Sequence, residues 1–104
     1  MLSRTADHLF WMSRYTERAE NTARMLSVSY DTSMLPMRPD DAARTWQGVL
    51  SISELIPAYQ ARYRDITRDN VLFFMVADES NPASIVSCLH AARENARAVR
   101  GALS

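Results

Sequence analysis

Arginine, glutamate and asparagine recur at helical spacing in two segments of this 104-residue chain. The segments cover residues 14–24 and residues 93–97. Together they supply a candidate polar cluster: Arg14, Glu17, Arg18, Asn21, Arg93, Glu94 and Asn95. A guanidinium group binds carboxylate or phosphate through two parallel hydrogen bonds, and a glutamate can act as acid or base. These residue types indicate either a network between helices or a site.

Three interpretations of this cluster are open. Side chains three or four residues apart are neighbours on a helix, so Arg14, Glu17 and Asn21 can form solvated surface pairs. Such pairs contribute only about 0.3 kcal/mol each. Alternatively, the cluster is a buried network that joins the first and last helices, which Asn95 favours because it lies near an apolar stripe. Glu17 or Arg18 is then at least partly buried and hydrogen-bonded to the last helix. The third interpretation is a binding or catalytic site.

The sequence predicts neither a metal site nor a cofactor. Di-iron helical bundles use Glu-x-x-His pairs on facing helices, and the sequence contains none. His8 and His90 lack partners at ligand spacing, and we expect both to be ordinary helix residues. Cys88 is expected on the buried side of the last helix, as a small core side chain. The sequence also lacks a glycine-rich phosphate loop and a nucleophile elbow.

Composition restricts the class of protein. Twelve basic residues, all of them arginine, balance twelve acidic residues, so no overall field favours nucleic acid or an anionic membrane. Hydrophobic residues make up 47% of the chain, which is enough for a core, and the single cysteine excludes an internal disulfide. The sequence has no signal peptide and no apolar run of membrane-spanning length. We therefore expect a cytoplasmic protein.

The apolar periodicity predicts an all-α fold, a bundle of four or five helices in a single domain over residues 1–104. A long first helix over about residues 3–30 carries two stripes. One is apolar and consists of Leu9, Met12, Tyr15, Ala19, Ala23, Leu26 and Tyr30. The other is polar in the middle and apolar at both ends: Phe10, Arg14, Glu17, Asn21, Arg24 and Val28. A helix with two such faces is expected to pack on more than one side.

Prolines divide the middle of the chain. Pro36 and Pro39 bound a loop, after which Asp40 is expected to cap a second helix over about residues 41–54. Pro57 should break that helix, because proline removes a backbone donor and clashes with the preceding turn. A short helical piece then continues to about residue 64.

Two further helices are expected towards the end of the chain. The apolar run at residues 71–76 suits a buried strand or a helix, and we choose a helix because no partner strand is evident. Asn81 and Pro82 predict the N-cap and the first residue of a last helix. This helix carries an apolar stripe through Ile85, Leu89 and Ala92.

The polar motifs resemble those of the Alpha-E domain family, a bacterial all-helical family named for a Glu-Arg motif. The resemblance begins in residues 1–11 and continues in Arg14-Tyr15-x-Glu17-Arg18-Ala19-Glu20-Asn21-x-x-Arg24, where Glu17-Arg18 matches the family motif. It continues in Asn81-Pro82-x-Ser84-Ile85-x-x-Cys88 and in Ala92-Arg93-Glu94-Asn95-Ala96-Arg97-x-x-Arg100. The resemblance extends over the whole chain, although residues 31–68 carry little signature.

The resemblance implies that this chain corresponds to the N-terminal third of a longer Alpha-E protein. It implies no established enzymatic activity. Family members are similar in being encoded beside, or fused to, ATP-grasp and transglutaminase-like proteins, which implies a peptide ligation or modification system. The expected function is a non-catalytic helical module or scaffold, with an ATP-grasp protein as partner. The alternative is an enzyme or ligand-binding domain that uses Glu17 and Arg18 on an amino-acid, peptide or phosphate-bearing substrate. We also expect a homo-oligomer, because uncovered apolar faces tend to find partners.

Overall fold

The computed structural model describes residues 2–103 and the side chains of residues 3–102, and within that range it consists of five α-helices and no strand. The helices are α1 (Leu2–Ser33), α2 (Pro39–Ile52), α3 (Ile56–Gln60), α4 (Arg68–Val76) and α5 (Ile85–Leu103). The predictions of an all-α fold, a long first helix and a helix over residues 71–76 are confirmed. None of these described helices has an apolar stretch long enough to cross a membrane.

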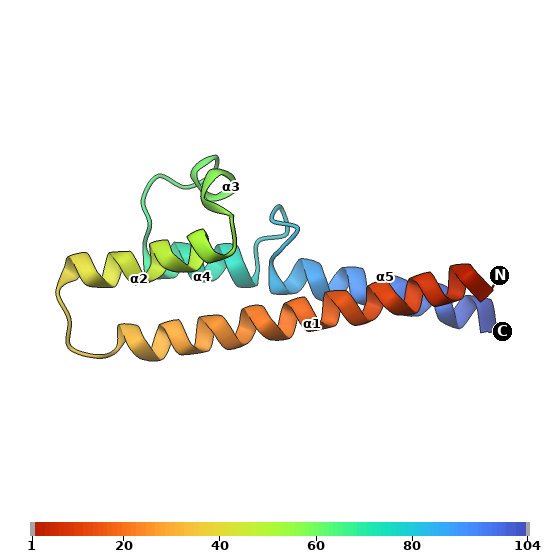
Figure 1. Cartoon of the computed structure of the whole chain (residues 1–104). Coiled ribbons are helices and arrows are strands. Elements are labelled where there is room, and N and C mark those ends of the chain that lie inside the picture. Colours follow the sequence, from red (N-terminus) through yellow and green to blue (C-terminus); the bar gives the residue numbers. More distant parts are fainter. Residues whose placement is uncertain (1, 104) are drawn as a thin grey trace.

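The molecule is elongated, with principal dimensions of 57 × 26 × 17 Å. Figure 1 shows α1 running along most of its length, with α5 antiparallel beside the N-terminal half of α1. This two-helix arm brings the start of α1 close to the end of α5. The helices α2 and α4 lie against the C-terminal half of α1, and α3 lies above them. The pairing of α1 with α5 is the most extensive contact between helices.

One row of α1 side chains faces the rest of the molecule, with alternating spacings of three and four residues. Its members are buried or half-buried: Thr5, His8, Met12, Tyr15, Ala19, Thr22, Leu26, Ser29 and Ser33. We call this row the α1 seam. Its spacing is that of helices that pack side by side as in coiled coils. On α5, Cys88 and Ala92 are buried and Asn95 half-buried at the same spacing.

The residues of the α1 seam differ in part from the apolar stripe predicted for the first helix. Four of the seven predicted residues lie in the seam: Met12, Tyr15, Ala19 and Leu26. The other three, Leu9, Ala23 and Tyr30, are exposed. The polar side chains of Thr5, His8 and Thr22 take their places at half-buried positions. Apolar periodicity alone missed these positions because their side chains are polar.

The main hydrophobic core lies at the end of the molecule where α2, α3 and α4 meet α1. It is a single cluster of buried side chains: Leu26, Trp46, Val49, Leu50, Tyr59, Val71, Phe74 and Met75. Tyr59 stacks on Tyr63 with ring centroids 4.7 Å apart, and Phe74 packs edge-on against Tyr59 at 5.3 Å. This aromatic group fixes α3 on α4 and positions the turn that follows α3.

The helix boundaries differ from the predictions at α2. Pro39 is the first residue of this helix and Arg38 is its N-cap, whereas Asp40 lies in the first turn. Proline suits this place because its fixed φ is helical and the first position needs no backbone donor. The break expected near Pro57 is present over residues 53–55, where Glu54 has a φ of 58°. Pro57 itself lies in the first turn of α3.

The predicted start of the last helix is wrong by three residues, because α5 begins at Ile85 rather than at Pro82. Asn81 is buried, and its Nδ2 donates to the Phe74 carbonyl at 2.9 Å, which ties the chain to α4. The Oδ1 of Asn81 accepts from the Ala83 N–H at 3.0 Å, which makes a turn rather than a helix. Ser84 then accepts the Ser87 N–H at 3.1 Å and takes the capping role predicted for Asn81.

Candidate functional site

The polar stripe of the first helix lies on the face of α1 opposite the α1 seam. Its six members are all exposed: Phe10, Arg14, Glu17, Asn21, Arg24 and Val28. We call this row the outer stripe. Two large apolar side chains at its ends are more than half exposed, Phe10 at 55% and Val28 at 61%. The spacing of the stripe alternates between four and three residues, as in the seam, so this surface has the spacing that a second helix would need for packing.

Glu17 and Arg18 are both exposed, which contradicts the buried-network interpretation, since that interpretation requires one of them to be partly buried. Across the part of the chain with described side chains, no hydrogen bond or ion pair joins either residue to another helix. The physical reason is the rotation of α1 about its axis. The helix presents Tyr15 and Ala19 to the interior, and the intervening Glu17 is carried to the opposite face by the helical repeat.

Asn95 does join the last helix to the first, but through His8. With the Nδ1–H tautomer assigned, His8 donates to Oδ1 of Asn95 at 2.9 Å. The Nδ2 of Asn95 donates to the Ala91 carbonyl of its own helix at 2.8 Å. A link between the first and last helices is therefore present, but it uses His8, more than two turns away from Glu17, and not Glu17 or Arg18 as the network interpretation expects. It gives His8 a structural role that the sequence analysis did not assign.

The other two α5 members of the predicted cluster point elsewhere. Glu94 pairs with Arg97 at 3.2 Å in an exposed contact on the same helix. Arg93 is exposed and lines a shallow hollow on α5 with Leu89 and His90. The seven predicted side chains are thus distributed over separate surfaces rather than gathered in one cluster. The outer stripe, the arm end and the outer side of α5 each hold some of them.

Arg18 lies apart from Glu17, in the wall of a pocket of about 500 Å³. The other walls come from α3, from the turn between α4 and α5, and from the start of α5. Arg62, in the turn after α3, lines the same pocket. We call this cavity the Arg18–Arg62 pocket. Glu17 does not line it, so the helix directs the two motif residues to different surfaces. Arg62 was not identified from the sequence, since it lies in a segment without recognisable motif.

A buried carboxylate anchors the turn beside this pocket. Asp78 is 6% exposed and accepts hydrogen bonds from the Ser80 hydroxyl at 2.6 Å, the Ser80 N–H at 3.0 Å and the Tyr63 hydroxyl at 2.9 Å. The Ser80 hydroxyl bond, more than the others, lowers the pKa of Asp78, although burial opposes it. Burial first, and then the bond to Asp78, raise the pKa of Tyr63. In the sequence, this segment carries only the helix-start signal of Asn81 and Pro82.

Cys88 is buried, at 1% exposure, as predicted for a core side chain. Burial raises the pKa of its thiol, while the nearby positive charge of Arg18 acts in the opposite direction. The second effect indicates that Arg18 on α1 lies close enough to α5 for its charge to act on this thiol. The thiol itself is a packed side chain and not an exposed nucleophile.

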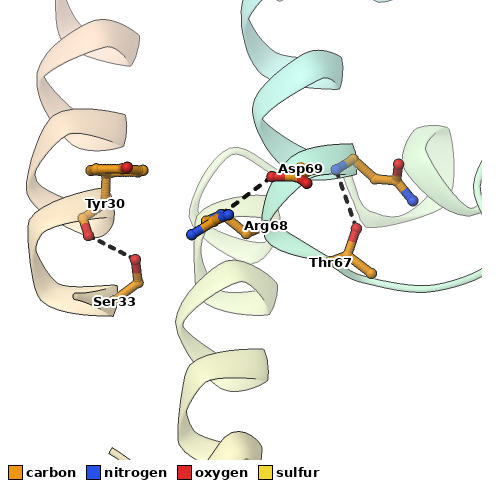
Figure 2. A network of polar contacts seen from close by, with 6 residues as sticks. Tyr30, Ser33, Thr67, Arg68 and Asp69 are labelled. Carbon is orange, nitrogen blue, oxygen red and sulfur yellow. Dashed lines mark hydrogen bonds and ion pairs between the residues drawn. The ribbon is translucent and has the colours of Figure 1, made fainter. Parts of the chain in front are cut away.

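A second polar network lies at the opposite end of α1, where α1 meets α4 (Figure 2). Thr67 caps α4 by accepting the Asn70 N–H at 3.2 Å, and Arg68 pairs with Asp69 at 3.2 Å. The Arg68 guanidinium also lies over the Tyr30 ring, 6.0 Å from its centroid. A neighbouring hollow of about 400 Å³ contains both Arg68 and Asp69. Because Asp69 neutralises Arg68, this network is a helix-end contact rather than a charged site.

Within residues 3–102, no three His, Cys, Asp or Glu side chains gather closely enough to hold a metal ion. Comparison with known families gives one match. A model named Alpha-E, described as a predicted alpha-helical domain with a conserved ER motif, matches residues 1–104. No curated protein and no solved structure matches the chain. Glu17-Arg18 is the one Glu-Arg pair in the sequence, so it corresponds to the conserved motif.

Proposed function

Because the chain belongs to the Alpha-E family, we propose that it is a non-catalytic helical scaffold whose outer stripe docks a partner protein. The proposed partner is an ATP-grasp protein of a peptide ligation or modification system. The kind of system and the partner come from the family resemblance. The docking surface is inferred from the exposed side chains of α1.

One observation supports this proposal most strongly, namely that Glu17 of the conserved motif is exposed and makes no hydrogen bond or ion pair with any residue that the structure describes. A charged residue that is retained in a family but contributes nothing to packing is best explained by contact with another molecule. Glu17 also lies outside the Arg18–Arg62 pocket, so it is poorly placed to act as an acid or base on a ligand there. Docking therefore accounts for Glu17 better than catalysis does.

The outer stripe defines the chemistry of its partner. From Phe10 to Val28 it extends over roughly 27 Å, at about 1.5 Å per residue. Apolar side chains at both ends can bury area, while Arg14, Glu17 and Arg24 in the middle require complementary charges. The partner surface should therefore be a helix with apolar residues at its ends and both acidic and basic residues between them. Charges at such a place select the partner and set its orientation.

Isothermal titration calorimetry between this chain and an ATP-grasp protein encoded beside it tests the proposal. The parent chain should bind, and Arg14→Glu should weaken binding at least about tenfold because like charges then meet. Arg64→Glu is the matched control, since Arg64 is also exposed but lies in the loop before α4. Absence of binding by the parent would remove the ATP-grasp protein as partner. Equal weakening by both variants would remove the outer stripe as the docking surface.

A further inference from the structure

The geometry points to a ligand site in the Arg18–Arg62 pocket. We infer that it binds the carboxylate of a small, partly apolar ligand, of the class formed by the C-terminal residue of a peptide. Arg18 and Arg62 supply the carboxylate contacts. This site is separate from the outer stripe and does not depend on a protein partner.

Two arginine side chains line this pocket from elements far apart in sequence. Arg18 comes from the middle of α1, and Arg62 comes from the turn after α3. Within the described part of the chain, neither is paired with a carboxylate. The charge of Arg18 acts on the buried Cys88, which follows the pocket residue Ser87, and the charge of Arg62 acts on Asp78 and Tyr63. Two like charges around one cavity repel each other, and an anion bound between them relieves this repulsion.

The surrounding groups favour a single negative charge on the ligand. The start of α5, a helix of 19 residues, adds the positive end of its dipole beside Ser87. Two acidic groups oppose this positive potential. Asp78 lies buried behind the turn, and the Glu79 carboxylate lies at the edge of the pocket, 4.0 Å from His90. These two acidic groups lower the positive potential around the two arginines without forming an ion pair with either. A carboxylate suits this balance better than a phosphate dianion, and Glu79 is available to a ligand ammonium or amide group.

Much of the remaining wall is apolar. The part of the ligand beyond its carboxylate should therefore be apolar as well. Leu55, Phe74 and Pro82 line the pocket together with small alanine side chains. A volume of about 500 Å³ is within the usual range for small-molecule sites, which combine apolar walls with a few polar groups. One or two small amino-acid residues with a free carboxylate match both the walls and the charges. Arg18, rather than Glu17, is then the motif residue that contacts the ligand.

Heteronuclear NMR titration of the full chain tests this inference with N-acetyl-alanyl-alanine, its C-terminal amide and inorganic phosphate as probes. The free acid should shift the amide resonances of Ser80, Ser87 and Ala91 in a saturable manner. The C-terminal amide should bind at least about tenfold more weakly, because it lacks the charge that the arginines contact. Phosphate should also bind more weakly than the free acid.

Three variants in the pocket and one control outside it attribute the binding to the pocket. Arg18→Gln and Arg62→Gln should each weaken binding of the free acid about tenfold, while Arg64→Gln should bind like the parent. Ala58→Trp should also abolish binding, because Ala58 lines the pocket and is exposed, so the larger ring fills the cavity without changing a charge. Unchanged spectra outside the pocket show that each variant is folded. Equal affinity for the acid and the amide, stronger binding of phosphate, or parent-like binding by Arg62→Gln would overturn the inference.

Discussion

Replacement of Glu17 by alanine separates a folding role of the motif from a docking role. Glu17 is exposed and makes no hydrogen bond or ion pair within the described part of the chain. Its removal therefore costs no buried contact, and alanine is at least as good a helix former. Exposed substitutions of this kind change the free energy of unfolding by less than about 0.5 kcal/mol. For a domain of this size, 1 kcal/mol shifts Tm by about 4–8 °C, so the shift should be smaller than about 4 °C.

Thermal unfolding followed by far-ultraviolet circular dichroism measures this shift. Glu20→Ala is the matched control, because Glu20 is an exposed glutamate on the same helix but lies off the outer stripe. Both variants should melt close to the parent. A buried charged pair that loses one partner would instead cost about 3–5 kcal/mol. A fall in Tm of more than about 12 °C for Glu17→Ala alone would thus refute the assignment of Glu17 to the surface.

The remaining predictions concern Asp78, pH and association. Asp78→Asn removes a charged acceptor from its bonds with Ser80 and Tyr63, so thermal melts should show a loss of about 2 kcal/mol, or roughly 10 °C in Tm. Because folding lowers the pKa of Asp78, its stabilisation is present above the unfolded value near 3.8 and is lost as pH falls through the lowered folded value. Between about pH 7 and pH 2, the parent should therefore lose more stability than Asp78→Asn, and an equal loss would contradict the assigned role. Without a partner, the exposed rings of Phe10 and Trp11 should drive self-association, and light scattering that finds only monomers at micromolar concentration would contradict this.

Much of the fold follows from local signals in the sequence. The unbroken run of helix formers predicts the long α1, and prolines at positions 39 and 57 predict interruptions that the structure contains near both places. The apolar run at residues 71–76 becomes a helix, with Val71, Phe74 and Met75 buried. These predictions succeed because backbone sterics and hydrogen bonding act over a few residues.

The errors arise where tertiary contacts override local preference. Asn81 and Pro82 are a strong helix-start signal, yet the bond from Asn81 to the Phe74 carbonyl holds this segment in a turn. Likewise, the α1 seam includes His8 and Thr22, whose polar side chains conceal the packing face from a search for apolar periodicity. His8 is tolerated there because Asn95 accepts the hydrogen bond of its imidazole ring. Such pairings depend on the register between α1 and α5, which neither helix encodes alone.

The candidate site was predictable only as a set of residue types. Motif spacing identified Glu17 and Arg18, but not that consecutive helix positions would direct them to separate surfaces. Arg62 carries no local signal, since its importance comes from the placement of α3 against α4 by the aromatic contacts of Tyr59. Whether adjacent motif residues share a site depends on the rotation of α1 against α5, and this rotation is a property of the packed pair.

The affinity of Glu17→Ala for the ATP-grasp protein, measured beside that of Glu20→Ala, is the most direct test of the central claim. That claim is that the conserved glutamate contacts a partner rather than the rest of its own chain. The account predicts that Glu17→Ala binds at least about tenfold more weakly than the parent, whereas Glu20→Ala binds like the parent. Both variants should keep the parent's Tm. Parent-like affinity of Glu17→Ala would contradict the account.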